Sequence, residues 1–96
     1  MSHPEVAVVL QALADQGLRP VGLGSDSRAI CAGEVFAAYP GFRSDGRRYV
    51  ADAVERGACA VLWEASDGMP PPALPVPCLP VEGLRALSGY LAHEIY

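Results

Sequence analysis

The sequence contains no lysine, and all seven of its basic residues are arginines. A nucleoside triphosphate is commonly held by a glycine-rich loop that ends in a lysine and a serine or threonine, and this chain has no such loop. The absence of a lysine amine also excludes a Schiff base and a lysine clamp on a phosphate. These absences favour a chain that binds a substrate over one that carries out chemistry on a triphosphate.

Cysteine and histidine are too few and too scattered for a disulfide framework or a zinc site. Cys31, Cys59 and Cys78 are odd in number and widely spaced, and His3 and His93 lie near opposite ends of the chain. Cys59 lies inside an apolar run, which predicts a thiol in the core. We therefore predict no metal site, and this use of cysteine fits a reducing cytoplasm.

Long apolar runs and an excess of basic residues are also missing. No segment has the length of a membrane span, and the N-terminus lacks the basic residue and apolar stretch of a signal peptide. The net charge of -4 argues against general nucleic-acid binding. Because 51% of the 96 residues are hydrophobic, one small core is possible, and we predict a single domain over residues 1–96.

Apolar residues recur at helical spacing in three segments, and three helices are predicted from this pattern. The first covers residues 3–16 and opens with a capping box of Ser2 and Glu5. The second is marked by apolar residues between 49 and 54 and ends at Gly57, and the third is marked by apolar residues from 84 to 95. The third helix reaches the end of the sequence without a stop signal. We therefore expect the chain to continue in a longer protein.

Short apolar segments between turn residues predict strands at 21–25, 35–39, 58–63 and 76–79. The proline-rich stretch 66–77 is typical of a surface loop. The second and third strands flank the middle helix, which predicts a parallel pair joined by a right-handed crossover. The predicted fold class is α/β, with a small sheet, this strand–helix–strand crossover and flanking helices.

The segment Ser25-Asp26-Ser27-Arg28 follows the first predicted strand. If strand geometry continues, Ser25 and Ser27 share one face, where their hydroxyls can donate and accept hydrogen bonds to a uracil or a ribose. Asp26 and Arg28 would share the other face and pair to brace the next loop. The alternative is a turn braced by Asp26 with both serines in solvent, and the four residues alone favour that alternative.

A second segment, Gly41 to Gly46, is a loop bounded by glycines and followed by a predicted helix. Backbone N–H groups in such a loop can approach an anion, as can the N-terminus of the helix. Arg43, Arg47 and Arg48 can add charge-assisted hydrogen bonds to a diphosphate. These residues predict a local anion site.

A purely structural explanation of this loop remains open as well. Asp45 would cap the helix, and the arginines would be solvated or paired with Asp52 and Glu55. Phe42, at the loop tip, can either stack on a base or fold back onto the core.

No residue is assigned to catalysis. No histidine lies near a serine or cysteine in an arrangement suited to nucleophilic attack.

Tyr49 and Trp63 are predicted to lie in the core.

The two segments, in this order and spacing, resemble the N-terminal domain of the Mur ligases. The likeness is strongest to the MurE type, which adds the third residue to the peptide of peptidoglycan, and it covers about residues 18–96. The matching residues are Asp26-Ser27-Arg28, Gly33 to Ala38, Gly41, Asp45 to Val50, Ala53, Gly57 to Leu62, and the late segment from Val76 to Leu91.

The resemblance implies roles for particular residues. Ser25 and Ser27 would contact the uridine part of the substrate. The residues that would line the uridine diphosphate site are Phe42, Arg43 and Ser44, supported by Asp26, Arg28, Gly41, Asp45 and Gly46.

The resemblance also implies an activity for a longer protein. Its substrate would be UDP-N-acetylmuramoyl-L-Ala-D-Glu. ATP would phosphorylate the D-glutamate carboxylate, and the amine of meso-diaminopimelate or L-lysine would attack the acyl phosphate. A central domain that binds ATP and a C-terminal domain that binds the amino acid would follow Tyr96, and ATP and Mg²⁺ would act in the full-length enzyme. Residues 1–96 would bind substrate without a cofactor and without catalysing the reaction.

Two alternatives stay open. MurF-type ligases, which add D-Ala-D-Ala, share a similar Asp-Ser-Arg and Asp-Gly pattern. Arg47-Arg48-Tyr49 favours the MurE type, because MurF-type sequences usually carry a histidine after Asp-Gly. The second alternative is a stand-alone, non-catalytic binding module.

Overall fold

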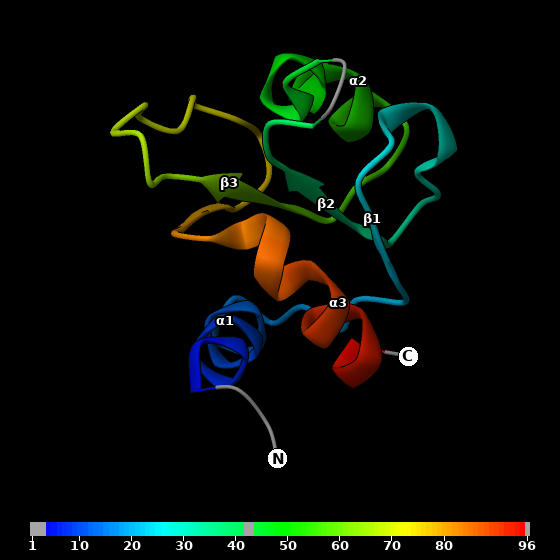
Figure 1. Cartoon of the computed structure of the whole chain (residues 1–96). Helices are drawn as coiled ribbons and strands as arrows, with labels where there is room; N and C mark the ends of the chain where they lie inside the picture. Colours follow the sequence, from blue (N-terminus) through cyan, green and yellow to red (C-terminus); the bar gives the residue numbers. More distant parts are fainter. Residues whose placement is uncertain (1–3, 42–43, 96) are drawn as a thin grey trace.

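A four-stranded parallel sheet forms the centre of the molecule (Figure 1). The structure is a computed structural model that describes residues 4–41 and 44–95. The strands lie in the order β1-β2-β3-β4, and each neighbouring pair is parallel. Their bounds are Leu23–Gly24 for β1, Val35–Ala38 for β2, Ala60–Glu64 for β3 and Cys78–Val81 for β4.

Three α-helices cover the two faces of this sheet. Figure 1 shows α1 (Pro4–Asp15) and α3 (Leu84–Ile95) on one face and α2 (Val50–Glu55) on the other. The two central strands are buried along their whole length, which is why they appear in the sequence as uninterrupted apolar runs.

Side chains alternate between two cores along the central strands. Val35 and Leu62 pack into the core beneath α1 and α3, whereas Phe36 and Trp63 pack into the core beneath α2. Cys59 is half-buried against the first core, where its thiol donates to the carbonyl of Gly33 at 3.3 Å. Burial raises the pKa of that thiol.

Two short 3-10 helices follow the first two strands. The helix η1 (Ser27–Ala29) comes after β1, and η2 (Gly46–Tyr49) comes after β2 and leads directly into α2. Because β1 and β2 are parallel neighbours, both 3-10 helices lie at the same edge of the sheet. This edge carries both segments that the sequence analysis singled out.

The structure confirms the fold class and the strand–helix–strand unit of β2, α2 and β3. The first strand is shorter than predicted, because the chain turns after Gly24. The fourth strand starts at Cys78, two residues later than predicted, and residues 66–77 contain no helix or strand. Ser2 lies outside the described residues, so the predicted capping box is not described.

One predicted core residue is wrong. Tyr49 is 39% exposed, because it ends η2 at the surface, whereas Trp63 is buried as predicted.

Among the described residues, no helix is both long enough and apolar enough to cross a membrane.

Candidate functional site

An open pocket of about 690 Å³ lies at the edge where β1 and β2 end. Ligands of parallel α/β sheets commonly bind at the carboxyl ends of the strands. The pocket is lined by Ser25, Asp26, Ser27, Arg28, Phe36, Tyr39, Gly41, Ser44, Gly46, Tyr49, Asp52 and Arg85.

The first predicted segment forms a capped turn. Asp26 is the N-cap of η1, where its Oδ1 accepts the backbone N–H of Arg28 at 2.9 Å. The same carboxylate accepts the Arg28 side chain through Nε at 3.1 Å and Nη2 at 3.2 Å. The prediction that Asp26 and Arg28 pair is therefore confirmed, and these hydrogen bonds lower the pKa of Asp26.

The strand geometry assumed for the two serines is wrong, because η1 begins at Ser27. Ser25 is exposed, whereas Ser27 is 7% exposed. Both residues nevertheless line the pocket. Their hydroxyls can each donate and accept a hydrogen bond there.

The second predicted segment contains a buried arginine. Arg47 is 6% exposed, and all five of its N–H groups are used. It donates to the Asp45 carboxylate through Nε and Nη2, with Nη2 at 2.6 Å. It also donates to the Asp67 carboxylate at 2.9 and 2.8 Å, and to the Glu64 carbonyl at 2.9 Å.

The proposed contact of Arg47 with a diphosphate is therefore wrong, since this guanidinium has no donor left for a ligand. The predicted partners Asp52 and Glu55 are also wrong for Arg47, which pairs with Asp45 and Asp67. Asp45 does cap the following helix, η2, as the structural alternative proposed.

Electrostatics in this cluster follow from the ion pairs. A hydrogen bond from the Arg47 side chain lowers the pKa of Asp45. A second hydrogen bond from the same side chain, to Asp67, holds the pKa of Asp67 at about 2. The two carboxylates in turn raise the pKa of Arg47. The guanidinium also lies over the Trp63 ring, 5.7 Å from its centroid.

The loop between β2 and η2 is shaped by backbone hydrogen bonds. Gly41 N–H donates to the Ser44 carbonyl at 2.9 Å, and Gly46 N–H donates to the Tyr39 carbonyl at 3.0 Å. Gly41, Ser44 and Gly46 line the pocket, whereas Asp45 turns to Arg47, and their role toward a uridine diphosphate stays a prediction. Phe42 and Arg43 lie outside the described residues, so their predicted roles stay predictions.

Five pocket residues were missed by the sequence analysis, and one of them is Phe36, a buried residue of β2. Tyr49 and Asp52 come from η2 and α2, and their place directly after the Asp-Gly turn could have drawn attention to them. Tyr39 follows β2. Arg85 stands on α3, far along the sequence, and no local pattern links it to the other residues.

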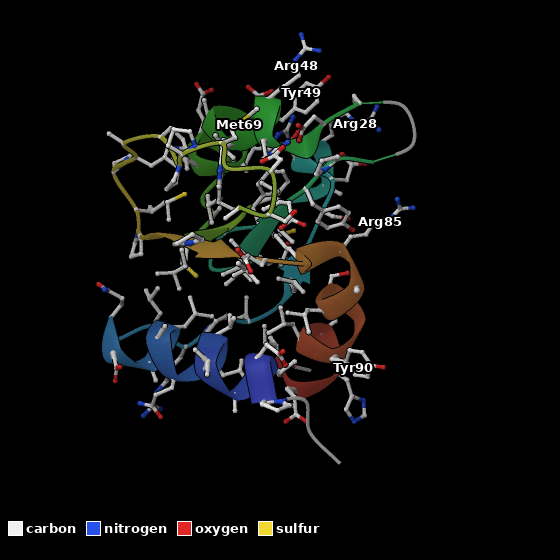
Figure 2. The ribbon with its side chains drawn as sticks, turned by 60° about the vertical axis from the view of Figure 1, so that its left-hand side comes forward. Arg28, Arg48, Tyr49, Met69, Arg85 and Tyr90 are labelled. Carbon is white, nitrogen blue, oxygen red and sulfur yellow. The ribbon has the colours of Figure 1, made fainter. Side chains whose placement is uncertain are left out.

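The arrangement suits binding of a polar, partly anionic molecule. Hydroxyls, two guanidinium groups and the exposed phenol of Tyr49 converge on one open pocket. Arg48 is exposed and points away from the body of the molecule (Figure 2). Within residues 4–41 and 44–95, no group of three His, Cys, Asp or Glu side chains is placed to hold a metal ion.

Comparison with known families gives one match over most of the chain. The model described as "Mur ligase family, catalytic domain" matches residues 20–96. A UDP-N-acetylmuramoyl-L-alanyl-D-glutamate–2,6-diaminopimelate ligase of Janthinobacterium sp. (strain Marseille) is 45% identical over 77% of this chain and 15% of the relative. The corresponding ligase of Pseudomonas putida is 38% identical over 100% of this chain and 19% of its own length.

A UDP-N-acetylmuramyl-tripeptide synthetase of Roseiflexus sp. (strain RS-1) is 52% identical over 78% of this chain and 14% of the relative. The chain thus spans less than a fifth of the length of these curated relatives.

Solved structures agree on the fold. MurF ligase from Thermotoga maritima, in complex with ADP, matches with a TM-score of 0.62 and 26% identity, over 76% of this chain and 16% of that one. MurF from Acinetobacter baumannii matches with a TM-score of 0.60 and 28% identity, over 72% and 14%.

Proposed function

The chain belongs to the Mur ligase family, and on that premise we propose that it binds the uridine diphosphate end of UDP-N-acetylmuramoyl-L-Ala-D-Glu. The binding site is the pocket at the carboxyl ends of β1 and β2. The observation that carries this proposal is the convergence of Ser25, Ser27 and Ser44 on one pocket from two separate loops.

The chemistry of the pocket suits such a ligand. A uracil ring has both donors and acceptors on its edge, and a ribose has hydroxyls, so serine hydroxyls can satisfy either. Ser27 is held in place by its position inside the capped turn of η1, and Ser44 by the hydrogen bond of its carbonyl with Gly41 N–H. Such preorganised polar groups reduce the entropy lost on binding.

We place ATP and Mg²⁺ outside these residues. The chain has no lysine and no triphosphate-binding loop, and its described residues contain no acidic or histidine cluster suited to a metal. The residues present therefore do not fit ATP or Mg²⁺. In a longer protein, the ligase reaction that adds the third peptide residue would take place on other domains, with this domain holding the substrate.

The experiment is a calorimetric or NMR titration of this chain with UDP-N-acetylmuramoyl-L-Ala-D-Glu, compared with Ser27→Ala. Loss of one hydrogen bond inside the pocket should weaken binding by about fivefold without unfolding the domain. The matched control is Ser66→Ala, which removes an exposed hydroxyl from the β3–β4 loop, outside the pocket. Unchanged affinity of Ser27→Ala would contradict the assigned site.

A MurF-type function is the second candidate, because MurF structures match this fold. The names of the curated relatives favour the MurE type. Product analysis of a longer protein containing this chain separates the two: diaminopimelate or lysine in the product supports the MurE type, and D-Ala-D-Ala supports the MurF type. A protein that binds the substrate and forms no product would support a stand-alone binding module.

A further inference from the structure

The guanidinium of Arg47 is buried and does not line the pocket, although the residue before it, Gly46, does. Taking a charge out of water costs free energy, and the ion pairs formed in return do little more than offset this cost. Such a cluster does fix a geometry, because each donor has to meet its own acceptor. The role of Arg47 therefore depends on which segments it holds together.

Arg47 joins two loops that are far apart in the sequence. On one side, it donates to the Asp45 carboxylate from Nε at 2.9 Å and from Nη2 at 2.6 Å. On the other side, it donates to both carboxylate oxygens of Asp67, at 2.9 and 2.8 Å, and to the Glu64 carbonyl at 2.9 Å. Asp45 belongs to the loop between β2 and η2, whereas Asp67 belongs to the β3–β4 loop. We call these hydrogen bonds the Arg47 clamp.

The β3–β4 loop is the anchored side of the clamp. Leu74 and Val76 of this loop pack against the core beneath α2, and Figure 1 shows the loop on that side of the sheet. The indole Nε1 of the buried Trp63 donates to the Met69 carbonyl at 2.9 Å. The Asp67 carboxylate in turn accepts the Met69 N–H at 3.1 Å. The β3–β4 loop thus holds Asp67 in place independently of Arg47.

The other side of the clamp carries part of the pocket. Ser44 and Gly46, the two neighbours of Asp45 in the chain, both line the pocket. Backbone hydrogen bonds such as that from Gly41 N–H to the Ser44 carbonyl close this loop on itself. The Asp45 carboxylate instead connects the loop, through Arg47, to the end of β3 and to the loop that follows it.

We propose that Arg47 and Asp67 are positioning residues of the pocket, which hold the loop between β2 and η2 in its binding conformation without touching the ligand. This role rests on the proposed function, and it makes a residue of the β3–β4 loop, outside the pocket, a determinant of affinity. A ligand binds more weakly when only part of the free protein has the binding conformation. Loosening the clamp should therefore weaken binding while every pocket side chain is still present.

The test compares the affinity of the wild-type chain and of Asp67→Ala for UDP-N-acetylmuramoyl-L-Ala-D-Glu, by calorimetry under conditions where both are folded. Asp67→Ala removes two hydrogen bonds of the clamp and no atom of the pocket lining. If the loop then keeps its binding conformation in about a fifth of the molecules, affinity falls about fivefold. Asp67→Asn keeps one acceptor for the guanidinium, so its affinity should lie between those two.

The matched control is Val9→Ala, which removes two buried methyl groups of α1 from the core on the opposite face of the sheet from α2. It should lower stability and leave the affinity at the wild-type value. Hydrogen exchange of the free chain gives a second measurement that loss of stability alone would not reproduce. The N–H groups of Gly41 and Gly46 should exchange faster in Asp67→Ala than in Val9→Ala.

The other outcomes separate this role from the proposed function. Wild-type affinity in Asp67→Ala, or an equal loss in Val9→Ala, would overturn the positioning role, because the clamp would then serve stability alone. Faster exchange without weaker binding would overturn it as well. If the wild-type chain did not bind the substrate, the proposed function would fail, and the positioning role with it. If Asp67→Ala did not fold, Asp67→Asn would carry the same comparison.

Discussion

Two Asp-x-Arg motifs of this chain share one local geometry and differ in everything around it. In Asp26-Ser27-Arg28 and Asp45-Gly46-Arg47, the aspartate caps a 3-10 helix and accepts the backbone N–H of the arginine, at 2.9 and 3.0 Å. Each aspartate also pairs with the arginine side chain. The Arg28 side chain is 85% exposed, whereas the Arg47 side chain is 4% exposed.

The difference arises from the neighbouring elements. Asp67, from the loop after β3, and the Glu64 carbonyl close over Arg47, and its guanidinium lies over the Trp63 ring. The η1 motif instead faces the open pocket. A sequence motif thus specifies the turn, and the surroundings decide whether its arginine supports the fold or faces a ligand.

The largest effect is expected when the buried arginine is replaced. Arg47→Met leaves Asp45 and Asp67 without their partner, but these carboxylates are 26% and 47% exposed and can be hydrated. We expect the free energy of unfolding to fall by about 2–3 kcal/mol, less than the ~3–5 kcal/mol typical of a fully buried pair. Urea unfolding measures this change, and a loss no greater than that of Arg28→Met would remove the distinction between the motifs.

The middle residues of the motifs should also not be interchangeable. A Cβ at Gly46 would lie 3.1 Å from the carbonyl oxygen of Tyr39, a tight contact with backbone. Gly46→Ser should therefore destabilise the domain by about 1 kcal/mol, in the range of mild overpacking. Thermal unfolding measures the change, and a variant as stable as the wild type would show that the loop accommodates a side chain here.

The two motifs should respond differently to acid. The folded-state pKa of Asp67 lies at about 2, below its ordinary value of 3.8. Its ion pair therefore contributes stability above pH 4 or so, and this contribution is lost as the pH falls toward about 2. Asp67→Asn should lose less stability between pH 5 and 2 than the wild type does, as measured by urea unfolding at each pH.

Asp26→Asn is the matched control for this pH series. The pKa of Asp26 is also lowered, by hydrogen bonds from Arg28, but its partner is exposed. Its acid profile should therefore stay closer to that of the wild type. The same flattening in both variants would contradict a special role for the buried pair.

The smallest effect on stability is expected for Arg28→Gln. An exposed ion pair is screened by solvent, so the urea midpoint should stay at the wild-type value. A clear loss of stability would show that η1, like η2, depends on its arginine.

The fold could be predicted well from the sequence because its signals are local. The apolar runs of β2 and β3 and the helical spacing of α1 and α3 place the elements correctly. The site could be predicted only where its residues are neighbours in sequence. Asp26 and Arg28 pair as expected, whereas the burial of Arg47 depends on Asp67, and the approach of Arg85 depends on how α3 crosses the sheet. Such long-range packing leaves no local pattern.

The most direct test of the contrast between the two motifs is an NMR titration of the arginine Nε–H groups with UDP. The resonances of Arg28 and Arg85, which line the pocket, should shift as UDP is added. The Nε–H of Arg47 should stay unmoved, because Arg47 is buried and does not line the pocket. A shift of Arg47 with no change at Arg28 and Arg85, or no shift of any arginine, would contradict the account.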